Sequence, residues 1–262
     1  MNTVKASLKV VKIGGNLIDD ASALSNFLKD YSALVGPKIL VHGGGKKATE
    51  VSDRLGFKSK LLEGRRVTST EELEVVTMVY AGLINKHIVA QLQQQKCNAI
   101  GLSGVDANLI QAKIRPKEPI DFGWVGDVTS VNISMIQYLI STHLVPVFCA
   151  ISHNGNGQLL NTNADTVAAE IAIALSQDYE VELIYCFEKN GVLRNVEDEN
   201  SVITHINYED YEQLKNKKII HEGMLPKIQN CFHALNNGVK KVKIGNAAIL
   251  QDASQIHTTL IL

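Results

Sequence analysis

Two clusters of glycine residues, one of them preceded by a lysine, are the part of this sequence best suited to bind a negatively charged group. Gly14 and Gly15 follow Lys12, and a run of three glycines occupies residues 43–45; each cluster comes after an apolar run and before a segment of helical pattern. A strand that turns into a helix through glycines exposes backbone N–H groups, which bind anionic oxygens. Lys12 adds a mobile positive charge suited to a phosphoryl group. Because neither cluster has GxxxxGK[ST] or GxGxxG spacing, the pair predicts a phosphate site of another kind.

Three further segments carry residues that could act on such a ligand. They are GRRVT at residues 64–68, NTNAD at 161–165 and GMLPK at 223–227. The planar guanidinium of Arg66 suits a carboxylate, although an exposed arginine is the alternative. Asn161 or Asn163 with Asp165 equally fits a helix N-cap with an acid in the first turn, and Lys227 fits an exposed lysine of a first turn.

Composition limits the classes of protein that this chain can belong to. It has 262 residues, 45% of them hydrophobic, and a net charge of −1, which predicts a sizeable core and no general attraction to nucleic acid. The longest uninterrupted apolar run, residues 144–151, is far shorter than the ~20 residues of a membrane span, and no secretory signal is recognisable. Four separated cysteines without a CxxC pair predict reduced, mostly buried thiols of a cytoplasmic protein. They are Cys97, Cys149, Cys186 and Cys231.

The elements that position these residues follow an α/β alternation. Strand-like and helical segments are expected in the pairs 8–13 with 18–35, 39–42 with 46–55, and 145–150 with 164–175. This pattern predicts a mostly parallel sheet covered by helices on both faces. Residues 57–68 and 109–131 interrupt the alternation and predict β-hairpins at the edge of the sheet, where a substrate lid can form. A second block begins near residue 181, so we expect an N-terminal lobe of residues 1–177 and a C-terminal lobe of residues 178–262.

Together the motifs resemble those of the amino acid kinase family. The resemblance rests on VKIGGN, VHGGG, GRRVT, the NK at residues 85–86, GLSGVD, VGDV, NTNAD and GMLPK, in that order and over nearly the whole chain. It implies an open αβα sandwich with a mostly parallel central sheet and two lobes, one for an acylated amino acid and one for ATP. The implied reaction moves the γ-phosphoryl group of ATP to the side-chain carboxylate of an N-acylglutamate, on the route to arginine.

The resemblance also implies roles for single residues. Lys12 and Lys227 would flank the transferred phosphoryl group, and Asp165 would orient both lysines. Backbone N–H groups would bind the phosphoryl oxygens and the attacking carboxylate, while two side chains would hold the other ends of the substrate. The backbone donors are those of Gly14, Gly15, Gly44 and Gly45, and the side chains are those of Arg66 and Asn161. Mg²⁺ would arrive with the nucleotide and need few protein ligands.

The expected nucleotide lobe departs from the family pattern at one place. The family usually has Thr/Ser-Asp-x-x-Gly-Val there, whereas this chain has Phe187, Glu188, Lys189, Asn190, Gly191 and Val192. Glu188 keeps a carboxylate and Gly191 keeps the glycine, so both remain candidates for binding the nucleotide. The resemblance places Ile219 and His221 on the other side of the nucleotide, and a buried packing patch is the alternative for them.

Other functions remain open at this point. They are another family member with a different acceptor, a non-catalytic sensor of an acyl-amino acid or nucleotide, and an NAD-linked oxidoreductase, the last opposed by the missing GxGxxG. Lys12, Asp165 and Lys227 argue against the sensor, because binding alone does not require charges aimed at a transferred group. The resemblance also predicts a homodimer. Because only about seven residues precede the first strand, we expect that arginine does not affect this homodimer.

The adjacent cations Arg65 and Arg66 raise the question of which acyl group is used. Neighbours on a strand point to opposite faces, which predicts Arg65 in solvent and Arg66 in the site. If both reach the pocket, a second guanidinium would suit an acyl group with its own carboxylate, such as succinyl.

Overall fold

A computed structural model describes residues 5–62, 65–220, 224–252 and 254–262. Within these ranges the main sheet has eight strands in the order β12-β14-β13-β11-β1-β2-β8-β5. Their bounds are β1 (Ala6–Ile13), β2 (Lys38–His42), β5 (Ala99–Leu102), β8 (Val145–Cys149), β11 (Tyr179–Cys186), β12 (His205–Ile206), β13 (Lys241–Gly245) and β14 (Thr258–Leu260). Every neighbouring pair is parallel except β13 with β14, so the predicted mostly parallel sheet is confirmed.

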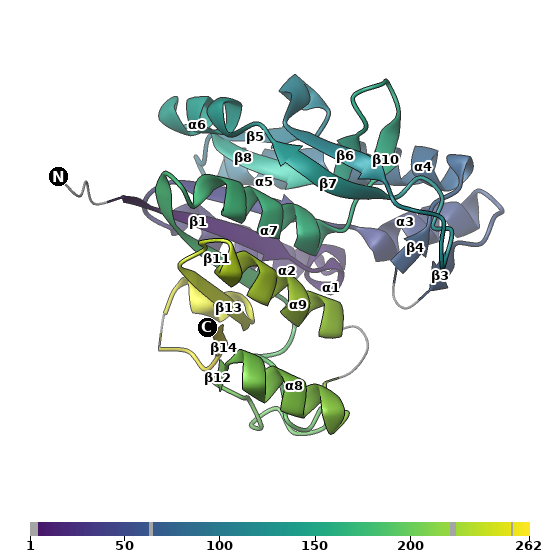
Figure 1. The fold of residues 1–262 in the computed structure, drawn as a ribbon. Coiled ribbons are helices and arrows are strands. Elements are labelled where there is room, and N and C mark those ends of the chain that lie inside the picture. The colour runs from purple at the N-terminus through teal and green to yellow at the C-terminus, as the bar shows by residue number, and fades with distance from the viewer. Residues whose placement is uncertain (1–4, 63–64, 221–223, 253) are drawn as a thin grey trace.

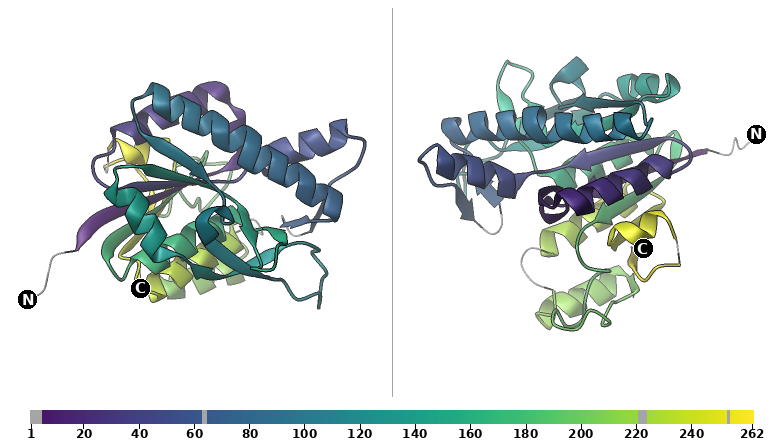
Figure 2. Two further views of the ribbon diagram at one scale, coloured as in Figure 1. Left: turned by 90° about the horizontal axis from the view of Figure 1, so that it is seen from above. Right: turned by 180° about the vertical axis from the view of Figure 1, so that it is seen from behind.

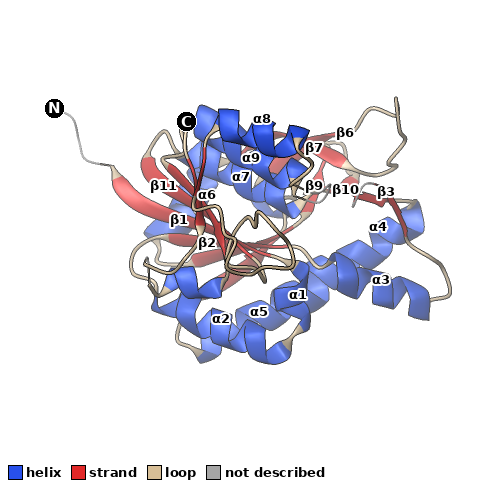
Figure 3. Cartoon of the chain, turned by 90° about the horizontal axis from the view of Figure 1, so that it is seen from below, coloured by secondary structure: helices blue, strands red, loops and turns tan. Residues whose placement is uncertain are grey.

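Helices cover both faces of this sheet (Figures 1 and 3). On one face lie α6 (Ile133–Ser141), α7 (Ala164–Leu175), α8 (Tyr208–Asn216) and α9 (Leu225–Asn236). On the other face lie α2 (Ala21–Ala33) and a long helical stretch made of α4 (Thr70–Thr77), the π-helical η1 (Met78–Ile84) and α5 (Asn85–Gln94), seen from behind in Figure 2. The short helices α1 (Gly15–Asp19) and α3 (Gly45–Arg54) begin at the two glycine turns, and η2 (Asp106–Asn108) and η3 (Ala247–Leu250) are single turns. The arrangement confirms the αβα sandwich.

Strand alternation decides which helical layer each site residue faces. In β1, Val10 is buried with the α7 layer and Val11 with the α2 and α5 layer. Lys12 is two residues after Val10 and therefore points toward α7. His42, two residues after Leu40, points instead toward α5.

Two small sheets stand beside the main one. Strands β3 (Lys60–Leu62) and β4 (Arg65–Val67) form one hairpin, and β6 (Ile110–Ile114) pairs antiparallel with β7 (Gly126–Val131) in a second sheet with β9 (Ile151–His153) and β10 (Leu159–Asn161). Both predicted hairpins are thus present. The predicted lobe boundary at residue 177 falls in the turn between α7 and β11, and the main sheet continues across it.

One predicted helix needs correction, and one long helical stretch was not predicted. The single helix expected at residues 18–35 is divided into α1 and α2, because Asp20 caps α2 by accepting hydrogen bonds from the N–H groups of Ser22 and Ala23. The stretch Thr70–Gln94 was not anticipated. It is long and apolar enough to cross a membrane by length and composition, but 44% of its most apolar window is buried in the protein, as in a core helix.

Candidate active site

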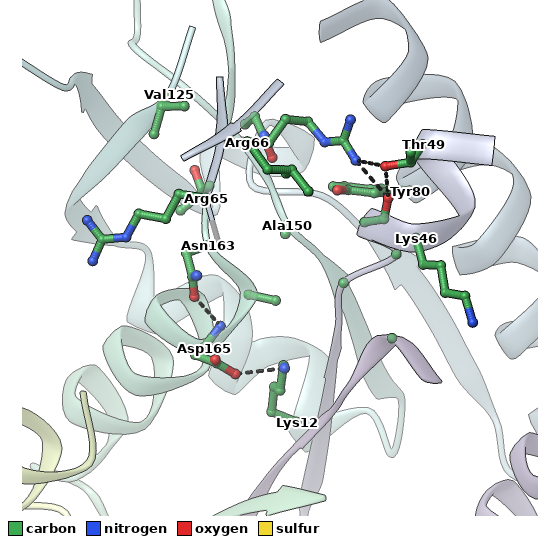
Figure 4. A pocket seen from close by; sticks show the side chains of 18 of the residues that line it. Lys12, Lys46, Thr49, Arg65, Arg66, Tyr80, Val125, Ala150, Asn163 and Asp165 are labelled. Carbon is green, nitrogen blue, oxygen red and sulfur yellow. Dashed lines mark hydrogen bonds and ion pairs between the residues drawn. The ribbon is translucent and has the colours of Figure 1, made fainter. Parts of the chain in front are cut away.

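A cavity of about 620 Å³ opens at the carboxyl ends of β1, β2 and β8 (Figure 4). This is the edge at which parallel α/β sheets bind ligands, because strands end there and glycine turns and helix N-termini begin. Among its lining residues are Lys12, Gly15, the 43–45 turn, Arg66, Asn161 and Asp165. The structure therefore brings together residues that are up to about 150 positions apart in the sequence, as the motifs predicted.

Asp165 lies between the two lysines at one side of this cavity. Its Oδ1 is 2.7 Å from Lys12 Nζ, and its Oδ2 is 2.7 Å from Lys227 Nζ. Asn163 caps α7 by accepting from the N–H groups of Asp165 and Thr166, which places Asp165 in the first turn. The Lys227 ammonium also lies over the ring of Tyr185, 5.5 Å from its centroid. The predicted orientation of two lysines by one carboxylate is present in this geometry.

The electrostatics of this triad act most strongly on Asp165, which they hold in its charged form. Burial by itself raises the pKa of Asp165, but the two lysines outweigh it and hold this pKa well below its ordinary value. Burial lowers the pKa of Lys12, while Asp165 opposes that effect and Lys227 adds to it. Two cations share one anion, so the cluster carries a net positive charge on the cavity side. An incoming anion such as a phosphoryl group would balance it.

The first glycine turn offers fewer donors than expected. The Gly14 N–H donates to the Cys186 carbonyl at 3.1 Å, so it is not available to a ligand in this structure. The expectation that this N–H binds a phosphoryl oxygen is therefore corrected: the group closes the end of β1 against β11. Gly15 lines the cavity at the start of α1, and its assignment stays a prediction.

The second glycine turn is shaped by close packing against the helical stretch 70–94. Gly44 has a φ of +153°, and a Cβ on it would lie 2.3 Å from Ile84 Cδ1 and 3.0 Å from Tyr80 Cδ1. Only glycine fits such a position without displacing its neighbours. Gly45 begins α3, so its N–H is among the helix N-terminal donors that the helix itself leaves free.

Arg66 lies in the cavity wall, and its guanidinium group already donates hydrogen bonds to other residues of the protein. Its Nη1 donates to Ser59 Oγ and to Glu72 Oε2, the latter at 2.7 Å, and its Nη2 donates to Gly45 O and Thr49 Oγ1 at 2.7 Å each. Arg66 and Glu72 side chains are both only 5% exposed. A substrate carboxylate that binds Arg66 must therefore share these hydrogens or displace an acceptor.

Arg65, Arg115 and Asn161 complete the lining on the side of the hairpins. Arg65 is exposed and points away from Arg66, as strand alternation predicts, yet both line the cavity (Figure 4). Arg115 is paired with Asp127, Nε to Oδ1 3.0 Å. Asn161 is buried and donates through Nδ2 to Thr68 Oγ1 at 2.9 Å, which leaves its Oδ1 as the acceptor atom of the amide.

Apart from the glycines of the first turn, the described residues expected to bind the nucleotide, Glu188, Gly191 and Ile219, do not line this cavity. Glu188 is exposed, and Ile219 is half-buried against the core, which favours the packing interpretation for it. A Cβ on Gly191 would lie 2.7 Å from Thr258 Oγ1 and from Val202 Cγ1, so this glycine is needed for close packing. His221, like Gly64 and Gly223 of the motifs, lies outside the described residues. Nucleotide binding by these residues stays a prediction.

Sequence reasoning missed several lining or supporting residues. Glu72, Thr49 and Tyr80 surround Arg66 and the second glycine turn, and Arg115 lines the hairpin side. A signal for one of them was present: Ser69 followed by Glu72 is the pattern of a helix capping box. Ser69 does cap α4, but the Glu72 carboxylate binds Arg66.

The chemistry that this site can perform is electrostatic rather than nucleophilic. Burial raises the pKa values of Cys149 and Cys186 to about 12, so neither thiol next to the glycine turns ionises near neutral pH. Within the described ranges, no group of three His, Cys, Asp or Glu side chains could hold a metal ion. Positive charge and backbone donors around a cavity suit the transfer of an anionic group to a nucleophile that the substrate supplies.

The fold and the site together define a kinase, and the chain belongs to the amino acid kinase family, whose sequence pattern matches residues 7–246. Two similar relatives are acetylglutamate kinases. That of Cytophaga hutchinsonii is 52% identical over 97% of this chain and 96% of its own length, and that of Bacteroides fragilis is 46% identical over 97% and 95%. Among solved structures, smu.665 from Streptococcus mutans UA159 has a TM-score of 0.79 at 26% identity, over 97% of this chain and 98% of its own.

Proposed function

We propose that this protein is an ATP-dependent kinase that phosphorylates the side-chain carboxylate of N-acetyl-L-glutamate, a step of arginine biosynthesis. The observation that carries the proposal is the Lys12–Asp165–Lys227 triad beside two glycine turns, with each ion pair at 2.7 Å. The acetylglutamate kinases at 46–52% identity, matched over nearly their whole length, support the choice of acceptor.

The mechanism follows from the charges involved. A glutamate side chain has a reference pKa of ~4.3, so near neutral pH it is already an anionic nucleophile and needs no general base. The barrier is the repulsion between this carboxylate and the phosphate chain. Lys12 and Lys227, each paired with Asp165, place positive charge beside the transferred group, and the Gly44 and Gly45 N–H groups bind its oxygens or the attacking carboxylate.

Mg²⁺ would be carried by the nucleotide, where it supplies charge between the β- and γ-phosphates. The donor set agrees with that arrangement, because Asp165, the carboxylate that lines the cavity beside Lys12, is already neutralised by two lysines. We assign residues 1–177 to the acyl-amino acid and residues 178–262 to the nucleotide, since the described cavity lies entirely in the first range.

We also propose that the enzyme is a cytoplasmic homodimer. All four cysteines are unpaired and buried, which fits a reducing compartment. Met78 and Leu83 of the helical stretch 70–94 are more than half exposed, and a contact with a second copy would cover their apolar side chains.

The cavity also favours a second acceptor, N-succinyl-L-glutamate. Arg65 and Arg115 both line the cavity, and among the described residues no ion pair of Arg65 is found. A free carboxylate on the acyl group would give Arg65 a charged partner. If so, Arg65→Leu lowers catalytic efficiency on the succinyl substrate more than on the acetyl substrate. No succinyl activity in the wild type, or an unchanged ratio in the variant, removes this role.

The proposed function is tested by a coupled assay for ADP release. The acceptors to compare are N-acetylglutamate, N-succinylglutamate, glutamate and aspartate, each with ATP and Mg²⁺. We expect turnover with an N-acylated glutamate and little with the free amino acids. Turnover with a free amino acid alone would assign the chain to another branch of the family, and binding without turnover would make it a sensor.

A further inference from the structure

A buried polar network stands behind the second glycine turn, on the face of the sheet opposite to the lysine triad. His42, at the end of β2, is completely buried, and its ring joins Gly43 of the turn to Asn85 of α5. The proposed catalytic residues do not include His42 or Asn85, although both belong to motifs found in the sequence.

The hydrogen bonds of Asn85 determine how this network is protonated. Its Nδ2 lies 2.9 Å from the Val147 carbonyl oxygen, which only accepts, so the amide nitrogen must face that side. The same Nδ2 lies 3.0 Å from His42 Nε2. His42 Nε2 must therefore be the acceptor, and the proton of the neutral ring is on Nδ1.

That proton is directed at the glycine turn. His42 Nδ1 lies 2.8 Å from the Gly43 carbonyl oxygen and donates to it. The carbonyl is thereby held toward the buried side of the turn. The Gly43–Gly44 peptide is trans, and in a planar trans peptide the N–H points opposite to the C=O. The Gly44 N–H is consequently aimed away from His42, toward the cavity that Gly44 lines.

The space for Asn85 depends on a third motif. A Cβ on Gly101, the first residue of GLSGVD, would lie 1.9 Å from Asn85 Oδ1. The Lys86 Nζ donates a hydrogen bond to the carbonyl oxygen of the same glycine, at 3.1 Å. Three motifs that are far apart in the sequence thus meet in one network behind the turn.

We propose that His42, held by Asn85, is a positioning residue that aims the Gly44 N–H at the reacting group. This inference rests on the proposed kinase function, because it gives Gly44 a ligand to bind. His42 itself does not touch the substrate. It acts by keeping one peptide plane in the orientation in which its N–H faces the cavity.

The test compares two replacements of His42. The amide nitrogen of Asn can take the place of Nδ1, whereas that of Gln reaches the place of Nε2 and leaves Gly43 without a donor. We expect His42→Gln to lower kcat by at least ~10-fold with little change in KM, and His42→Asn to stay within about threefold of the wild type. A role in packing alone predicts the reverse order, since Gln is closer to His in volume.

Two further measurements accompany this comparison. Gly101→Ala should reproduce the kcat loss of His42→Gln because it displaces Asn85, while His205→Gln, an exposed histidine of β12, should change nothing. Melting temperatures of all variants show whether each one folds. In the wild type, ¹⁵N NMR of the His42 ring should show a proton on Nδ1 and none on Nε2 near neutral pH.

Each outcome decides between the alternatives. Equal kcat for the two His42 variants at similar melting temperatures, or a better Gln variant, overturns the inference, and so does an Nε2–H ring in the wild type. The NMR result stands even if both variants fail to fold. A wild type that releases no ADP with any acceptor contradicts the proposed function instead, and leaves the tautomer as the test of the network.

Discussion

Replacing Asp165 by Asn removes the charge that holds the two lysines while keeping the shape of the side chain. The amide leaves the Lys12 and Lys227 ammonium groups, now 2.7 Å from a carboxylate oxygen each, without an anion. Leaving a buried charge unpaired costs ~3–5 kcal/mol, and we expect the lower end because all three side chains retain 11–15% exposure at the cavity. For a chain of this size ~3 kcal/mol corresponds to a melting temperature lower by ~6–12 °C.

The effect on catalysis should be larger than the effect on folding. Losing one preorganised electrostatic group costs ~10²–10³ in kcat, and here both lysines lose their orientation. The pKa of Lys12, already lowered by burial, should fall further without Asp165. As pH rises, Lys12 should therefore lose its proton, and the variant its residual activity, at a lower pH than in the wild type. The assay is ADP release with N-acetylglutamate as a function of pH.

Stability should depend on pH in the direction set by Asp165. The pKa of Asp165 is depressed in the folded protein. Above the ordinary aspartate pKa of ~3.9, the wild type should therefore have a larger free energy of unfolding than the variant, and this difference should shrink as pH falls below that value. The control is Glu182→Gln, which also replaces a carboxylate by an amide. Glu182 Oε1 lies 2.6 Å from Nζ of the buried Lys243, and neither residue lines the cavity. It should lower the melting temperature and leave kcat unchanged. An Asp165→Asn variant with near-normal kcat would refute the reasoning.

Three other predictions follow from the same geometry. Lys12→Ala and Lys227→Ala should each lower turnover by at least ~10²-fold with a smaller effect on substrate binding, and near-normal turnover in either folded variant would remove that lysine from the mechanism. Gly44→Ala should lower the melting temperature and kcat together, because its Cβ would lie 2.3 Å from Ile84 Cδ1 at a φ of +153°; a variant as stable as the wild type would show that the turn can move. Sedimentation equilibrium should give the mass of a dimer, and a monomer would contradict the proposed assembly.

The sequence predicted those parts of the site that depend on local rules. Glycines between a strand and a helix, and residues at the carboxyl ends of parallel strands, must meet at one edge of the sheet. These rules place Lys12 and Asp165 at the ends of elements that meet at this edge, and the family resemblance implied that they act together. The cap of α7 also followed from residue type at the helix start, whereas the same signal at Ser69, which caps α4, was not used.

Other contacts could not be predicted, because they depend on the distance between elements. Whether the Gly14 N–H faces a ligand or the Cys186 carbonyl is set by how closely β1 and β11 end together. That Glu72 binds Arg66 depends on the angle between a hairpin and α4. Gly191 has the sequence of a nucleotide-binding glycine, yet its surroundings at Thr258 and Val202 are those of a packing position.

The central claim is that the carboxylate of an N-acylated glutamate attacks the γ-phosphoryl group without a protein nucleophile. The most direct test is to trap the product with hydroxylamine, which converts an acyl phosphate into a stable hydroxamate. With ATP, Mg²⁺ and N-acetylglutamate, the wild type should form hydroxamate and ADP in equal amounts, and Lys12→Ala should form at least ~10²-fold less of both. ADP release without hydroxamate, or equal amounts from wild type and variant, would contradict this account.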